Sequence, residues 1–160
     1  GKPDSSSWRT IRDALIGLPL PVSKGQESVV ANHMLVPGAR VYPSHTGSPF
    51  DMPAKTLKAG AHGVPGGENI LVLPDGAIRY FTIRECARFQ TFPDDYAFVG
   101  TWKSLVSQVG NAVPVTLVEH VSRAIHDQLM THQTRERSVQ ARPTNVPLLS
   151  DVRGRLLCVR

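Results

Sequence analysis

Cysteine is scarce in this sequence, because only Cys86 and Cys158 among its 160 residues carry a thiol. So few cysteines exclude the disulfide-stapled scaffolds of small secreted proteins. Long apolar runs are missing as well. None approaches the roughly 18 residues of a membrane span, and the first residues lack the apolar core of a signal peptide. We therefore expect no membrane partner.

Several self-contained chemical motifs are also missing. The sequence has no GxxxxGK(S/T) phosphate loop, no GxGxxG dinucleotide turn and no pair of CxxC motifs. Its six histidines do not have the spacing of metal ligands, so we expect no metal site. Cys86 falls inside an amphipathic segment, where a small buried thiol is a simpler interpretation than a nucleophile.

Positive charge exceeds negative charge by +5 over the whole chain, which favours an anionic partner without identifying one. The excess is uneven, because residues 131–160 carry six arginines against Glu136 and Asp151, a net charge of +4. We expect this segment to be a basic tail that is solvated or poorly ordered, with a dedicated binding element as the alternative. The length is typical of one domain.

Capping signals and apolar periodicity predict four helices. They span residues 8–16, 83–90, 101–109 and 114–130. Ser7 would cap the first helix, and Thr82 with Glu85 forms a capping box for the second. Gly110 should end the third helix and Pro114 should occupy the first position of the fourth. The fourth helix should bury one apolar face. That face consists of Val118, Val121, Ile125 and Leu129.

Glycine and proline concentrate between residues 37 and 76, so no helix longer than one turn is expected there. Within and after this region, residues 70–73 and 77–81 flank a Pro-Asp-Gly turn, which predicts a β-hairpin. The stretch 59–69 is rich in glycine, which lets a backbone approach a phosphate or a base edge closely. Composition alone favours a plain surface loop there.

Two further motifs are specific enough to suggest a family. Residues 84–96 read RECARFQTFPDDY and resemble the RECARLQxFPDDY signature of the cytosine-C5 DNA methyltransferases. Residues 108–114 read QVGNAVP and resemble that family's closing motif, QxGNAVP. Residues 53–60 also resemble a segment that these enzymes place in their target recognition domain. The resemblance covers about residues 8–130 and none of the tail.

The resemblance implies roles for particular residues. The residues expected to contact double-stranded DNA are Lys55, Thr56, Lys58, Gly60, His62, Gly66 and Gly67, with Arg40 and Arg79 as further candidates. Those expected beside S-adenosylmethionine are Asn111, Ala112 and Val113. The structural residues of the two motifs are Arg84, Glu85, Arg88, Gln108 and Gly110. The charged helix would be a strut between the recognition and catalytic domains, although spacing alone fits a solvent-exposed amphipathic helix equally well.

Two parts of the family pattern are absent, namely its Phe-x-Gly-x-Gly cofactor loop and its Pro-Cys-Gln nucleophile loop. Family members flip the cytosine out of the duplex, attack its C6 with that cysteine and transfer a methyl group to C5. We therefore interpret the chain as a C-terminal fragment or subunit of such an enzyme, inactive alone and without a catalytic residue. The alternatives are an inert DNA-binding or regulatory module and a folded remnant without activity.

The expected fold is α+β, with a small, irregular, loop-rich β recognition domain followed by helices that would complete a Rossmann-like methyltransferase core. The expected segments are a linker with a short helix (1–21), the target recognition domain (22–81), the closing helices (82–130) and the basic tail (131–160). The apolar faces of helices 83–90 and 114–130 would pack on the missing N-terminal half, and the fragment should self-associate without it. The resemblance also implies a cytoplasmic, bacterial protein of DNA methylation and restriction-modification.

Overall fold

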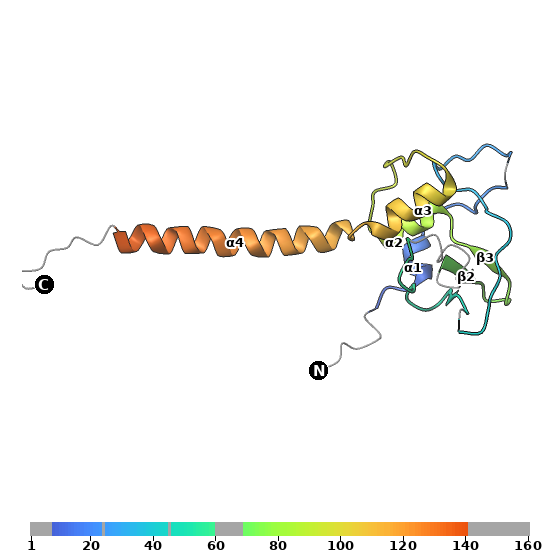
Figure 1. Ribbon diagram of the computed structural model, residues 1–160, viewed down its shortest axis with the longest axis horizontal. Coiled ribbons are helices and arrows are strands. Elements are labelled where there is room, and N and C mark those ends of the chain that lie inside the picture. Colours follow the sequence, from blue (N-terminus) through green and yellow to red (C-terminus); the bar gives the residue numbers. More distant parts are fainter. Residues whose placement is uncertain (1–7, 24, 45, 60–68, 141–160) are drawn as a thin grey trace, which may run out of the picture. The chain divides into compact units, whose positions relative to one another are not determined.

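The computed structural model describes residues 8–23, 25–44, 46–59 and 69–140. The helices are α1 (Ile11–Leu15), α2 (Ile83–Phe89), α3 (Trp102–Asn111) and α4 (Val115–Gln140), and the strands are β1 (Ser48–Pro49), β2 (Ile70–Val72) and β3 (Ile78–Tyr80) (Figure 1). One small sheet together with helices makes the fold α+β, as the sequence predicts. Contacts divide the chain into two units, Gly1–Glu119 and His120–Arg160.

The sheet has the strand order β1-β2-β3. Strands β2 and β3 pair in antiparallel fashion with Leu71 opposite Arg79, which confirms the predicted hairpin. Strand β1 pairs with β2 in parallel, and Gly47 just before it has a φ of 78°. A Cβ at Gly47 would lie 2.9 Å from Cγ2 of Val72, so only glycine lets the chain approach β2 this closely. The described part of residues 37–76 contains no α-helix, as predicted.

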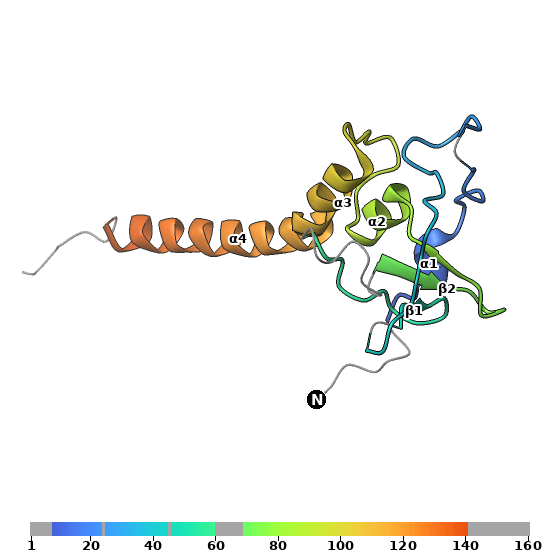
Figure 2. The same cartoon turned by 45° about the vertical axis from the view of Figure 1, so that its right-hand side comes forward.

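Helix α2 lies between α1 and α3, and the three helices form the core with the hairpin (Figures 1 and 2). The buried core cluster consists of Ile11, Leu71, Phe81, Ile83, Cys86, Ala87, Phe98, Leu105, Val106 and Val109. The apolar face of α2 is therefore covered by this chain itself. The prediction that this face packs on a missing half is wrong.

The caps of α1 and α2 follow one pattern, in which a threonine and an acidic residue three positions later satisfy each other's backbone N–H groups. Thr82 and Glu85 form the predicted box at α2. At α1 the box is made by Thr10 and Asp13, so the helix begins later than residue 8 and its predicted cap, Ser7, lies outside the described residues.

Helix α3 continues through Gly110 and Asn111, although these residues were expected to end it. Gly110 remains in the helix, and Val109, directly before it, is buried in the core with Leu105. The helix ends at Asn111, and the next residue, Ala112, is extended with a ψ of 144°. Pro114 disfavours a return to helical conformation at Val113, the residue directly before it.

Helix α4 is 26 residues long and ends at Gln140, not near residue 130. Residues 131–140, predicted as part of a solvated basic tail, are therefore helical, and no glycine or proline interrupts α4. Pro114 precedes the helix by one residue, and its carbonyl oxygen accepts from the N–H of Val118. Residues 141–160, including Cys158, lie outside the described residues.

The predicted buried face of α4 is exposed in this chain. The side chains of that face are 46 to 58 % exposed, and they are Val118, Val121, Ile125 and Leu129. The periodicity was correctly predicted, but the described residues contain nothing that covers it. Across the described residues, no helix is long and apolar enough to cross a membrane.

Candidate functional site

Residues 46–59 form a segment that is fixed at several points along its length. The buried Ser48 accepts a hydrogen bond from the Lys55 N–H at 3.1 Å. Further along, the buried side chain of Asn69 accepts from the Lys58 N–H and donates to the Lys58 carbonyl, each at 3.4 Å. Lys55, Thr56 and Lys58, all predicted to contact DNA, are exposed on this braced segment. The Lys55 ammonium donates to Oγ1 of Thr46 at 3.3 Å.

The end of this segment lies directly against α3. A Cβ added to Gly110 would stand 2.9 Å from the Cα, Cβ and N atoms of Ala59, a distance that real side chains do not adopt. Gly110 therefore allows Ala59, the last described residue of this segment, to pack closely against the last turn of α3. The structure thus brings the segment predicted to read DNA next to the turn predicted to face the cofactor.

The three residues predicted beside the cofactor follow this contact. Asn111 is the exposed last residue of α3 and donates a long hydrogen bond to Oγ of Ser107 at 3.4 Å. Ala112 is half-buried, and Val113 is 57 % exposed. Gln108, also exposed, donates to Oγ of Ser104 at 3.1 Å.

A cavity of about 500 Å³ lies where these segments meet. Its walls come from the start of α1, from residues 53–57, from the end of α2 at residues 88–91 and from the turn between α3 and α4. Thr91, one of its lining residues, has a φ of 58°, which is rare for a β-branched side chain. Its Oγ1 accepts from the Thr116 N–H at 3.0 Å, and the Gln90 carbonyl accepts from the Val115 N–H at 3.0 Å. The end of α2 therefore satisfies the first free N–H groups of α4.

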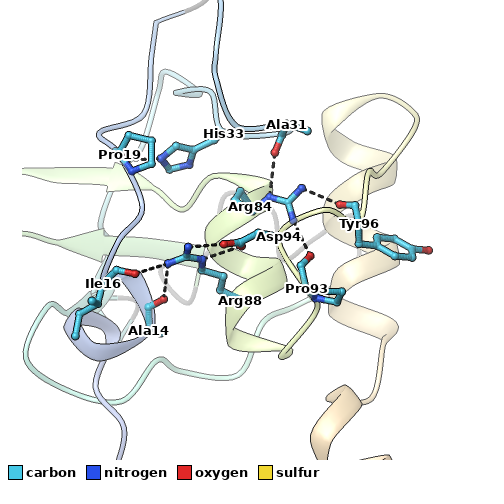
Figure 3. A network of polar contacts seen from close by, with 10 residues as sticks. All are labelled: Ala14, Ile16, Pro19, Ala31, His33, Arg84, Arg88, Pro93, Asp94 and Tyr96. Atoms are coloured by element: carbon cyan, nitrogen blue, oxygen red, sulfur yellow. Dashed lines mark hydrogen bonds and ion pairs between the residues drawn. The ribbon is translucent and has the colours of Figure 1, made fainter.

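Arg84 of the first motif is completely buried, and no carboxylate among the described residues bonds its guanidinium. It donates instead to three backbone carbonyls, which belong to Ala31 (3.0 Å), Pro93 (3.1 Å) and Tyr96 (2.7 Å) (Figure 3). Burial lowers the pKa of Arg84 from its ordinary value. The side chain joins segments that lie on either side of α2 in the sequence.

Glu85 is 1 % exposed and is the acidic centre of a second cluster. Its carboxylate accepts from the Thr82 N–H at 2.9 Å and from both terminal nitrogens of Arg79, at 2.7 and 2.6 Å. A bidentate pair of this kind fixes the arginine in one orientation. Arg79, one of the candidate DNA contacts, therefore directs its guanidinium toward α2.

Arg88 connects α2 to the N-terminal part of the chain. It pairs with Asp94 and donates to the carbonyl oxygens of Ala14 (3.2 Å) and Ile16 (2.8 Å) (Figure 3). Hydrogen bonding from Arg88 lowers the pKa of Asp94 and raises that of Arg88 itself. Because Arg84 and Glu85 are buried and Arg88 is largely so, the interpretation of α2 as a solvent-exposed amphipathic helix is wrong.

Sequence reasoning missed two residues that belong to this network, Asn32 and His33. The Asn32 side chain accepts from the Phe98 N–H at 3.0 Å and donates to the Phe98 carbonyl at 3.1 Å. The buried His33 lies 2.8 Å from both the Pro19 carbonyl and the Thr82 hydroxyl. Since a carbonyl only accepts, we assign the ring proton to Nε2, and Nδ1 then accepts from Thr82. No local pattern in the sequence signals these contacts.

The remaining predicted residues contribute less to the geometry. Cys86 is buried in α2, and burial together with the nearby Glu85 charge raises the pKa of its thiol, so it does not supply a thiolate. Arg40 is exposed. Four predicted DNA contacts lie outside the described residues, namely Gly60, His62, Gly66 and Gly67. Within the described ranges, no group of histidine, cysteine and acidic residues could hold a metal ion.

Comparison with known proteins identifies the family. The model of the C-5 cytosine-specific DNA methylases matches residues 25–127, which include the 46–59 segment, α2, α3 and the first part of α4. The chain belongs to this family. Both motifs that suggested the family from the sequence lie inside the matched range.

Several curated DNA methylases are similar to this chain. The type II methyltransferase M.AplI of Arthrospira platensis is 39 % identical over 77 residues, which cover 48 % of this chain and 22 % of that protein. M.MthTI of Methanothermobacter thermautotrophicus is 33 % identical over 146 residues, which cover 75 % of this chain and 44 % of that protein. DNA (cytosine-5)-methyltransferase 2 of Arabidopsis thaliana is 49 % identical over 51 residues, which cover 32 % of this chain and 3 % of that protein. The chain therefore spans less than half the length of these methylases.

Proposed function

We propose that this chain supplies target recognition and the closing helices of a DNA (cytosine-5-)-methyltransferase, and that the nucleophile loop comes from outside these 160 residues. The observation that carries the proposal is the close contact at Gly110, where the segment bearing Lys55, Thr56 and Lys58 meets the turn at Asn111. A methyltransferase must hold DNA and methyl donor close together, and this contact brings the two expected sites together. The target recognition domain would comprise residues 22–81.

Lys55 and Lys58 are the proposed phosphate contacts, and Thr56 between them offers a hydroxyl to the same strand. Both lysines are exposed, and hydrogen bonds to Ser48 and Asn69 hold their backbone in place. Such bracing limits the entropy lost when DNA binds. Lysine contacts to phosphate contribute affinity, whereas the adjacent loop would read bases.

The turn after α3 fits one wall of an S-adenosylmethionine pocket. Val113 is 57 % exposed and Asn111, two residues earlier, is exposed as well, so the turn offers one apolar and one polar side chain to a ligand with both kinds of surface. The bound cofactor would supply the methyl group. Asn111, Ala112 and Val113 would position it, and this chain would contribute no residue to the methyl transfer itself.

The proposed partner is the N-terminal catalytic half of the enzyme, on the same chain or on another. The exposed face of α4 is available for this half, because apolar residues at helical spacing favour burial. The residues of this face are Val118, Val121, Ile125 and Leu129. Without the catalytic half, the same face would drive self-association, and light scattering that finds only monomers across the micromolar range would contradict this part of the proposal.

The salt dependence of DNA binding tests the proposed phosphate contacts of Lys55 and Lys58. Binding of a labelled duplex would be measured by fluorescence anisotropy over a series of NaCl concentrations for the wild type, Lys55→Ala and Lys58→Ala. Each substitution should weaken binding and make the salt slope shallower by about 0.9, the value for one phosphate contact. Lys103→Ala, which removes an exposed lysine of α3, is the matched control. Unchanged salt slopes in both variants would show that these lysines do not contact DNA phosphates.

Complementation tests the proposed division of the enzyme. The chain is mixed with S-adenosylmethionine and duplex DNA, with and without an N-terminal half that carries the Pro-Cys-Gln loop, and methyl transfer is assayed. Activity only in the mixture supports the proposal. The alternative, an inert DNA-binding module, predicts DNA binding without complementation. Activity of the chain alone would refute the proposal.

A further inference from the structure

The cavity beside Gly110 is lined in part by Arg9, a charged residue that lies outside the family match and among none of the predicted contacts. Its volume of about 500 Å³ lies within the range of pockets that hold small molecules or parts of larger ones. Several lining residues are apolar, among them Ile11, Leu57 and Phe89. The cavity therefore suits a ligand with an apolar portion, and it is too roomy for a lone inorganic ion.

The charges around this cavity all have one sign. Three cationic residues line it, Arg9, Lys55 and Arg88, and the described lining includes no acidic residue. Arg88 is already engaged by Asp94 and by backbone carbonyls, so its charge mainly holds the wall in place. Arg9 and Lys55 are both exposed and both line the cavity. A cavity with this lining favours an anion.

The walls are held by contacts that do not depend on a ligand. The Ile11 N–H donates to the Met52 carbonyl at 3.0 Å, which ties the start of α1 to the 46–59 segment. On the other side, the Gln90 amide donates to the Val109 carbonyl at 3.1 Å, which ties the end of α2 to α3. A preformed cavity loses little entropy on binding.

We infer that this cavity receives one nucleotide unit of a DNA strand, with its phosphate between Arg9 and Lys55 and its sugar against the apolar lining. The inference rests on the proposed function and extends it, because Arg9 lies outside the predicted recognition domain and is assigned no role by the motifs. A phosphodiester supplies the negative charge, and its sugar occupies the apolar space that a free phosphate would leave empty. Arg9 is thus a DNA-binding residue contributed by the segment before α1.

Substitution of Arg9 tests the inference through the salt slope, in the same duplex-binding assay. Arg9→Gln should reduce the slope by about 0.9 and weaken binding at low salt, because it removes one phosphate contact. Arg9→Lys keeps the charge and should retain most of the slope. The control is Lys103→Gln, which removes the same charge from an exposed position that does not line this cavity.

The possible results separate this inference from the proposed function. Equal losses in Arg9→Gln and Lys103→Gln would show a general charge effect and overturn the inference. If Lys55→Ala and Lys58→Ala flatten the slope but Arg9→Gln does not, the inference fails and the proposed function stands. If none of the three changes the slope, both fail. Inorganic phosphate that competes with the duplex at matched ionic strength, and does so only when Arg9 is present, would indicate a free-phosphate site and also overturn the inference.

Discussion

Substitution of Gly110 by alanine distinguishes helix propensity from tertiary packing, because the two act in opposite directions at this position. Gly110 lies inside α3, where alanine should gain up to about 1 kcal/mol from propensity alone. The new Cβ would stand 2.9 Å from three atoms of Ala59, two of them backbone atoms that cannot rotate away. Overpacking of this kind costs about 1–3 kcal/mol. With three close contacts we take the upper end, which leaves a net loss of about 2 kcal/mol.

Urea denaturation followed by far-UV circular dichroism would measure this loss, with DNA anisotropy measured on the same samples. DNA affinity should fall as well, because residues 55–59 must move away from α3 and carry Lys55 and Lys58 with them. Ser107→Ala is the control for helix propensity, since it lies on α3 one turn earlier. It should be neutral or slightly stabilising.

A second substitution tests the assigned cause. Ala59→Gly removes one of the three close contacts, so it should recover part of the stability lost in Gly110→Ala while costing stability in the wild type. A double-mutant cycle gives this coupling directly. The reasoning is refuted if Gly110→Ala stabilises the chain by about 1 kcal/mol, or if the two substitutions have additive effects.

Three further predictions follow from the α2 network. Arg84→Met should cost about 3–5 kcal/mol in urea denaturation, because three carbonyls lose a charged donor; a loss below about 1 kcal/mol would contradict this. Because the pKa of Asp94 is lowered, its pairing with Arg88 stabilises the fold above about pH 4 and is lost as the pH falls through that lowered pKa. Asp94→Asn should therefore flatten the acid limb of the stability curve, and an unchanged acid limb would argue against the pair. In Cys158→Ser protein, maleimide should label Cys86 only after unfolding, and rapid labelling of the native protein would contradict its burial.

Local signals in the sequence predicted the parts of the fold that depend on neighbours along the chain. The hairpin followed from a Pro-Asp-Gly turn between β-prone runs, and the start of α2 followed from the spacing of Thr82 and Glu85. The family followed from two motifs that the comparison also covers. Each of these depends on residues only a few positions apart.

Contacts between distant segments could not be predicted in this way. Spacing left open whether the charges of α2 face solvent, since the partners of Arg84 lie up to 53 residues away, at Ala31. The roles of Asn32 and His33 depend on Phe98, Thr82 and the Pro19 carbonyl, and no local pattern encodes such contacts. The helix at residues 131–140 was not predicted, for a different reason. Basic composition indicates a tail, but no glycine or proline there interrupts a helix, and residues 131–137 are exposed as a solvated segment would be.

The start of α4 has a consequence for the order in which the chain folds. Its first N–H groups are bonded by Gln90 and Thr91 at the end of α2, and the residue before the helix is Pro114, whose side chain offers no acceptor. Forming the first turn is the slow and unfavourable step for any helix. Here that step is assisted by a helix more than twenty residues earlier in the sequence. Amide protection at Val115 and Thr116 should therefore appear in hydrogen exchange only once α2 has formed, so the first turn of the longest described helix depends on a much shorter helix.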